Sequence, residues 1–72
     1  MNNAIMIRVH LDMQSAQRKR LVEELSGSKG VAHANLFYRQ NYWLNVVYDT
    51  KFITSDIIIN QVRQLDENAA IF

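Results

Sequence analysis

The sequence of 72 residues contains no cysteine, no proline and two glycines. Without cysteine there is neither a disulfide framework nor a thiolate site for zinc or copper, so packing and hydrogen bonding must stabilise the fold. No apolar run approaches the roughly 20 residues that a membrane-spanning helix needs, and the first residues do not follow the pattern of a signal peptide. We therefore expect a cytoplasmic protein without a membrane span.

The charge balance is also small, with eight Lys and Arg residues against seven Asp and Glu residues and a formal net charge of +1. Such a charge creates no long-range field that would attract nucleic acid or anionic membranes by itself. A chain this short allows one domain, over residues 1–72, which buries about 60% of its unfolded surface.

Motifs of catalysis and phosphate binding are missing as well. The segment Gly27-Ser28-Lys29-Gly30 lacks the remaining glycine and the Lys-Ser/Thr pair of a phosphate loop. No nucleophile elbow or pair of catalytic carboxylates is present, and Ser26 has no histidine partner that the pattern brings near it. We predict that the protein is not an enzyme and needs no cofactor.

Hydrophobic periodicity predicts three strands in the first two thirds of the chain. Apolar residues alternate from Ile5 to Leu11, again from 32 to 39, and again from 42 to 48, which is typical of strands with one buried face. Gln40-Asn41 is the expected turn between the second strand and the third. On the third strand we expect one face to carry Leu44, Val46 and Tyr48.

Two segments instead have helical spacing. Residues 15–26 carry Leu21 and Leu25 four apart among charged residues, with Ser15 or Asp12 as the expected cap, and two glycines follow. A second helix is expected from Ser55, with Ile58, Val62 and Leu65 on its buried face, before a final strand over 69–72. The order predicts an α+β, ferredoxin-like βαββαβ fold, with both helices on one face of a four-stranded antiparallel sheet and the second and fourth strands outermost.

Several segments resemble those of heavy-metal-associated (HMA) domains. They are Val9 to Gln17, Leu21 to Leu25 with Gly30-Val31 after it, and Tyr48-Asp49. Members of that family carry a Met-x-Cys-x-x-Cys loop that binds soft metal ions. In this chain Asp12 occupies the methionine position, while Gln14 and Gln17 occupy the two cysteine positions. Thr50 stands for a family proline, and Asp66-Glu67 stand for a terminal Gly-Tyr.

The resemblance implies an HMA-like scaffold that has lost its metal chemistry. Soft ions such as copper(I) need thiolate or thioether ligands, and glutamine offers a hard amide oxygen. We expect Asp12, Gln14 and Gln17 to cap a helix and solvate a loop. His10 and His33 remain as an alternative, weak two-histidine metal site, although zinc usually takes at least three protein ligands.

The sheet face without helices is predicted to be unusually apolar, which favours a contact surface for a protein partner or for a second copy of the chain. The alternation assigns to this face Met6, Arg8, His10, His33, Asn35, Phe37, Trp43, Asn45 and Val47. Trp43 and Phe37 serve either as anchors of an interface or as a cross-strand pair that stiffens the hairpin. Arg8 and Arg39 leave base stacking of a nucleic acid as an alternative, which the small net charge and the absence of an RNA-recognition signature disfavour.

Overall fold

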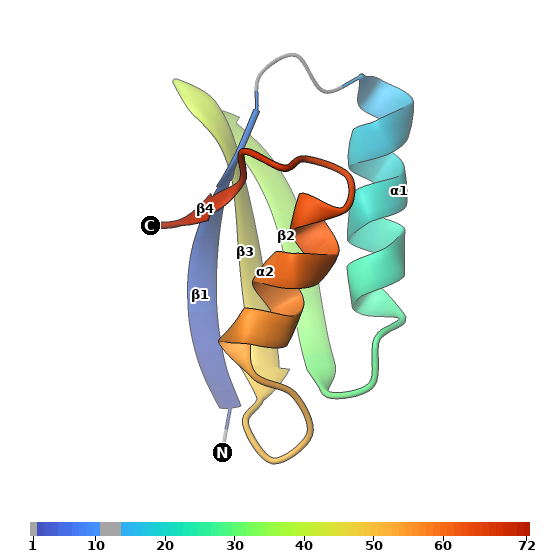
Figure 1. The fold of residues 1–72 in the computed structure, drawn as a ribbon, viewed down its shortest axis with the longest axis vertical. Coiled ribbons are helices and arrows are strands. Elements are labelled where there is room, and N and C mark those ends of the chain that lie inside the picture. The colour runs from blue at the N-terminus through green and yellow to red at the C-terminus, as the bar shows by residue number, and fades with distance from the viewer. Residues whose placement is uncertain (1, 11–13) are drawn as a thin grey trace.

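The computed structural model describes residues 2–10 and 14–72 of the chain. The elements follow the predicted order of strand, helix, strand, strand, helix, strand (Figure 1). The strands are β1 (Asn2–Val9), β2 (Val31–Arg39), β3 (Asn41–Asp49) and β4 (Ala70–Ile71), and the helices are α1 (Ser15–Ser26) and α2 (Ser55–Arg63). The predicted α+β class is confirmed.

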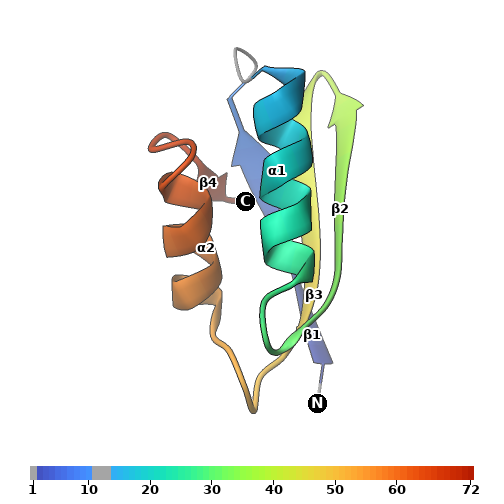
Figure 2. The same ribbon diagram turned by 90° about the vertical axis from the view of Figure 1, so that its right-hand side faces the viewer.

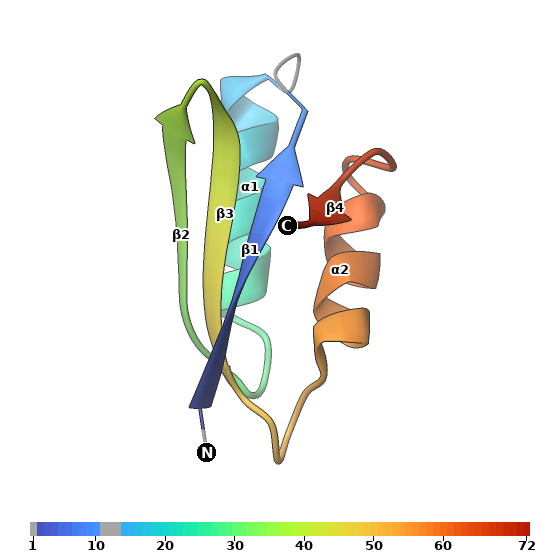
Figure 3. The same cartoon turned by 90° about the vertical axis from the view of Figure 1, so that its left-hand side faces the viewer.

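The four strands form one sheet in the order β2-β3-β1-β4, and each neighbouring pair is antiparallel (Figure 3). The predicted outer strands, β2 and β4, therefore do form the two edges. This arrangement is compatible with a ferredoxin-like fold. The fourth strand is shorter than the predicted range 69–72, because only Ala70 and Ile71 pair with β1 as strand residues.

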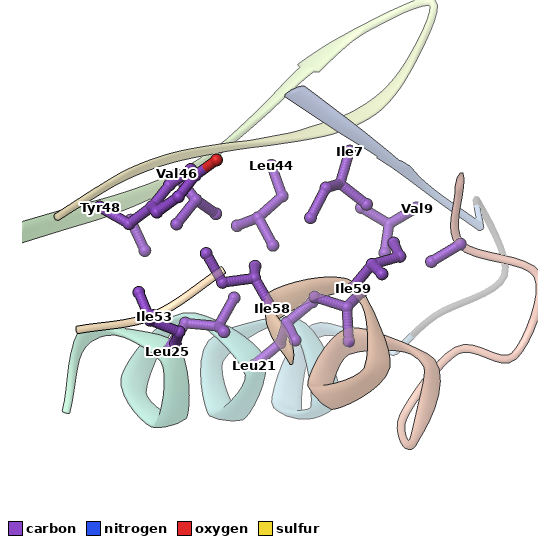
Figure 4. Close-up of a cluster of buried hydrophobic side chains, with 13 residues drawn as sticks. Ile7, Val9, Leu21, Leu25, Leu44, Val46, Tyr48, Ile53, Ile58 and Ile59 are labelled. Atoms are coloured by element: carbon purple, nitrogen blue, oxygen red, sulfur yellow. The ribbon is translucent and has the colours of Figure 1, made fainter. Parts of the chain in front are cut away.

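Both helices cover the same face of the sheet (Figure 2). The core lies between these two layers, where Ile7 and Leu44 of the sheet point toward Leu21 and Ile58 of the helices (Figure 4). Burying each such side chain contributes about 1.5–3 kcal/mol. The predicted core-facing sets of β1, β3 and both helices are confirmed in Ile7, Val9, Leu21, Leu25, Leu44, Val46, Tyr48, Ile58 and Val62, with Ile5 and Leu65 partly buried against them.

The second strand departs from its predicted alternation at its start. The pairing of β2 with β3 shifts register between Val31 and His33, so Ala32 is exposed rather than on the core face. At the other end, Gln40 alone separates the two strands, with a left-handed φ of 65°. The predicted two-residue turn was therefore one residue too long, since Asn41 already belongs to β3.

The ends of the helices correct one prediction of capping, and they confirm that the second helix begins at Ser55. Gln14, rather than Ser15, is the N-cap of α1, and the N-cap of α2 is Thr54, whose hydroxyl accepts a hydrogen bond from the backbone N of Ile57. Gly27 ends α1 with an ordinary right-handed φ of −86°. Only Gly30 uses the freedom of glycine, with a φ of +93°. Within residues 2–10 and 14–72, no helix has the length and apolar character to cross a membrane.

Candidate functional site

The strand register gathers the predicted contact residues on the sheet face opposite the helices. Arg8 of β1, Trp43 of β3 and Phe37 of β2 form one row across three strands. The neighbouring rows contain Met6 beside Asn45 and Asn35, and Ala4 beside Val47 and His33. We call this surface the open face. Because alternate residues of a strand point to opposite sides, none of these side chains takes part in the core.

The apolar part of the open face forms a shallow groove of about 280 Å³, lined by Met6, Phe37, Arg39, Gln40, Trp43 and Phe72. The rings of Trp43 and Phe72 meet edge to face, with centroids 5.1 Å apart and an interplanar angle of 82°. The indole Nε1 of Trp43 donates a hydrogen bond to the backbone carbonyl of Arg39 at 3.0 Å. The polar group of Trp43 is thus satisfied within the molecule, which leaves its ring as apolar contact surface.

Phe72 is the groove residue that the sequence analysis did not assign. Its backbone N donates to the carbonyl of Met6 at 2.8 Å, which extends the pairing of β4 with β1 by one residue. Ala70 lies opposite Arg8, so alternation brings Phe72 to the open face as well. Its side chain is 87% exposed despite the contact with Trp43. The sequence signal for this placement was the spacing of two residues between Ala70 and Phe72, which puts both side chains on the same face of a strand.

The two histidines of the alternative metal site do not come together. His33 lies in the row of Ala4, whereas His10 follows Val9 at the far end of β1. The five residue steps from Ala4 to Val9 span about 17 Å of strand. The prediction of a shared His10–His33 site is wrong. Both residues were assigned to the same face of the sheet, but they lie near its opposite ends. Across residues 2–10 and 14–72, no cluster of three or more His, Cys, Asp or Glu side chains is placed to hold a metal ion.

His10 also does not belong to the groove. Its backbone N donates to the carboxylate Oδ2 of Asp66 at 2.6 Å, and it lines a separate hollow of about 280 Å³ with Arg8, Val9, Asn41 and Asn68. Asp66 is 8% exposed and accepts a second hydrogen bond, through Oδ1, from the backbone N of Asn68 at 3.2 Å. This carboxylate joins the end of β1 to the loop between α2 and β4.

The glutamines at the cysteine positions of the resemblance sit at the start of α1. Gln14 is the N-cap and Gln17 is the third helical residue, whose side-chain Oε1 accepts a hydrogen bond from the backbone N of Gln14 at 3.1 Å. This is the return bond of a capping box, in which the third helical residue reaches back to the cap. Both glutamines are exposed. Asp12, which stands at the methionine position of the resembling HMA loop, lies outside the described residues.

The basic residues of α1 lie on the opposite side of the sheet from the groove. Arg18 stacks over the ring of Tyr42, 4.4 Å from its centroid, and Arg20 pairs with Glu24 at 2.9 Å. Arg20 and Glu24 lie one helical turn apart on the same helix. Because both contacts are internal, the run adds no positive charge to the open face, where Arg8 and Arg39 are the arginines.

No model of a known protein family matches the sequence, and a search of curated proteins found no match.

Proposed function

We propose that the chain is a non-catalytic, metal-free module with an HMA-like, ferredoxin-like scaffold, which binds a protein partner or a second copy of itself through the open face. The observation that carries this proposal is the groove, in which side chains from β1, β2 and β3, together with Phe72 after β4, present an apolar surface that the described residues leave uncovered. Apolar surface that polar residues border, as Arg39 and Gln40 border this groove, is typical of interaction sites.

The residue types of the groove support a protein partner. Trp, Phe, Met and Arg are the types enriched at protein interfaces, and two of its walls are the aromatic rings of Trp43 and Phe37. Aromatic residues in the centre of an interface commonly contribute most of the binding energy. Stiffening of the hairpin accounts for Trp43 through its bond to Arg39, but it gives no role to the 87% exposed ring of Phe72.

The capping bond at the start of α1 supports the metal-free part of the proposal. The side-chain amide oxygen of Gln17 accepts a hydrogen bond from the backbone N of Gln14. The two residues that stand at the cysteine positions of HMA domains thus stabilise the start of the helix. This return bond satisfies a backbone N–H at the start of the helix. The two glutamines thus have a structural role that does not require a ligand.

The proposal is tested by light scattering after size-exclusion chromatography over a wide concentration range. We expect the mass of the wild type to rise with concentration, and the rise to be smaller in Trp43→Ala and Phe37→Ser, which lose association through the open face. Phe52→Ser is the matched control, because Phe52 is 58% exposed in the loop after β3 and lies outside the open face. Equal behaviour of Trp43→Ala and Phe52→Ser would exclude self-association through this face.

Nucleic-acid binding is the competing outcome of the same design. It would appear as salt-sensitive binding of a single-stranded oligonucleotide, because binding to phosphates releases counterions. That binding would be lost on changing Arg8 or Arg39 to Gln and would replace the protein-partner proposal if the light-scattering variants had no effect.

A further inference from the structure

The free edge of β2 is a second surface, distinct from the open face. β2 is the outermost strand of the sheet on that side, and no described element lies beyond it (Figure 2). Proteins usually protect such an edge with lysine, proline, a short strand or a bulge. β2 has nine residues, no lysine and no proline, and its one bulge lies at the Val31 end. The stretch from Ala34 to Tyr38 therefore has none of these protections.

The hydrogen-bond pattern identifies the backbone groups that face outward. The N of Asp49 donates to the carbonyl of Gly30 at 2.7 Å, so Asp49 and every second residue before it in β3 direct their backbone groups toward β2. The partners of those residues in β2 are the odd-numbered positions such as Asn35, opposite Asn45. Alternation then leaves the backbone groups of Ala34, Leu36 and Tyr38 free at the edge.

The side chains of β2 make this edge complementary to itself. Small residues occupy its first half, at Ala32 and Ala34, and large residues occupy its second half, at Leu36, Phe37 and Tyr38. We propose that two copies of the chain pair antiparallel along β2, about a two-fold axis at Asn35. Ala34 then lies opposite Leu36 of the second copy and His33 opposite Phe37, the bulge at Ala32 marks the end of the paired stretch, and the two sheets become one.

This register uses the outward-facing groups and avoids like charges. Ala34 and Leu36 form hydrogen-bonded pairs with each other across the axis, while the side chains of the two Asn35 residues lie side by side in a non-hydrogen-bonded pair. Arg39 lies opposite Val31. Moving the axis to Ala34 would oppose Arg39 to Lys29. Like charges placed directly opposite each other destabilise a strand pair.

Pairing would also cover apolar surface that the single chain leaves open. Leu36 packs against the core but is only partly buried, and Tyr38 is 62% exposed. Both side chains lie on the helix-covered side of the sheet, so the second copy would extend that side with Ala34. This inference rests on β2 alone and stands independently of the open face.

Cross-linking through a single introduced cysteine tests the axis, because the wild type has no cysteine that would compete. In the proposed pair the two Asn35 Cα atoms are about 4.5 Å apart, within the range of about 4.4–6.8 Å that a disulfide accepts. We expect Asn35→Cys to form at least about tenfold more covalent dimer under mild oxidation than Ala32→Cys. Ala32 is exposed on the same strand, and its copies would lie about 20 Å apart along the pair.

Charge substitution at the same position gives a second, reversible test. Asn35→Lys and Asn35→Glu should each weaken the dimer by roughly fivefold, and an equimolar mixture of the two should restore it, because opposite charges then meet at the axis. Asn2→Lys is the matched control, an exposed asparagine of β1 on the far side of β3.

Three results would overturn the inference. The first is a wild type that stays monomeric at all concentrations, and the second is equal cross-linking of Asn35→Cys and Ala32→Cys. The third is a mixture of Asn35→Lys and Asn35→Glu that dimerises no better than either variant alone. Cross-linking of Asn35→Cys should persist when Trp43→Ala is added. Loss of the cross-link in that double variant would assign the dimer to the open face and not to β2.

Discussion

At the scale of single residues, Gln14 and Gln17 decide what the first strand-helix connection does. The hydrogen bond between the backbone N of Gln14 and the side chain of Gln17 ties both residues to the start of α1. Under the proposed HMA-like scaffold, the same two positions correspond to the metal ligands of that family. The proposal therefore assigns helix capping, in this chain, to positions that bind metal in HMA domains.

This difference predicts the outcome of a metal titration. The wild type should show no tight binding of copper(I) in competition with a chelator, because it offers no thiolate. The variant Gln14→Cys with Gln17→Cys should gain stoichiometric binding, since both positions lie within the first turn of one helix. Stoichiometric copper(I) binding by the variant His10→Gln with His33→Gln, which keeps Gln14 and Gln17, would contradict the prediction.

The two glycines give a matched pair for stability. A Cβ at Gly30 would lie 2.8 Å from Cβ of Phe52, and the φ of +93° is unfavourable for any L side chain. Gly30→Ala should lower the free energy of unfolding by roughly 1–3 kcal/mol. Gly27 has a right-handed φ, and its Cβ would meet only ordinary contacts.

Gly27→Ala should therefore change the free energy of unfolding by less than about 1 kcal/mol, with stabilisation as the expected sign. Urea denaturation of both variants beside the wild type measures the difference. Equal destabilisation by the two substitutions would show that the φ of Gly30 and its contact with Phe52 do not limit the fold.

At the scale of elements, Asp66 holds the short β4 in its place beside β1. Its carboxylate accepts hydrogen bonds from the backbone N of His10 at 2.6 Å and of Asn68 at 3.2 Å, and Arg63 Nε donates to the carbonyl of Ala69 at 3.0 Å. A strand of two residues makes few ladder bonds of its own. These side-chain bonds therefore supply much of what fixes the loop before it.

Asp66→Ala should leave the backbone N groups of His10 and Asn68 without their partner and lower the free energy of unfolding by about 1.5–3 kcal/mol. Glu67→Ala is the control, because Glu67 is exposed and adjacent. Hydrogen exchange should report faster exchange of the Phe72 amide in Asp66→Ala than in Glu67→Ala. Unchanged exchange would separate Asp66 from the docking of β4.

The elements also differ in how well the sequence predicted them. The strands around Ile7 and Leu44 and both helices follow from periodicity, because a fully buried face forces regular spacing. The bulge at Ala32 and the single-residue turn at Gln40 did not follow, since neither position carries the glycine or asparagine that usually marks such a conformation. The capping role expected of Gln14 and Gln17 is confirmed, whereas Ser15, the stronger N-cap type, is the first helical residue of α1.

At the scale of the whole molecule, the open face is predictable and its extent is not. Alternation alone brings Phe37 and Trp43 to the same side of the sheet, as the register confirms. Phe72 joins them only because β4 pairs with β1 in a register that Asp66 and its loop help to fix. The predicted metal site of His10 and His33 was wrong because alternation predicts which face of the sheet a residue lies on, but not which residues of other strands lie beside it.

The central claim, that the open face is a contact surface, is tested most directly by the fluorescence of Trp43, the single tryptophan of the chain. If copies associate through this face, the emission of Trp43 should shift to shorter wavelength and its quenching by acrylamide should fall as the concentration rises. Association through β2 alone would leave both signals unchanged, because Trp43 lies on β3 and within the groove. A rise in mass without any change in Trp43 emission would contradict the claim.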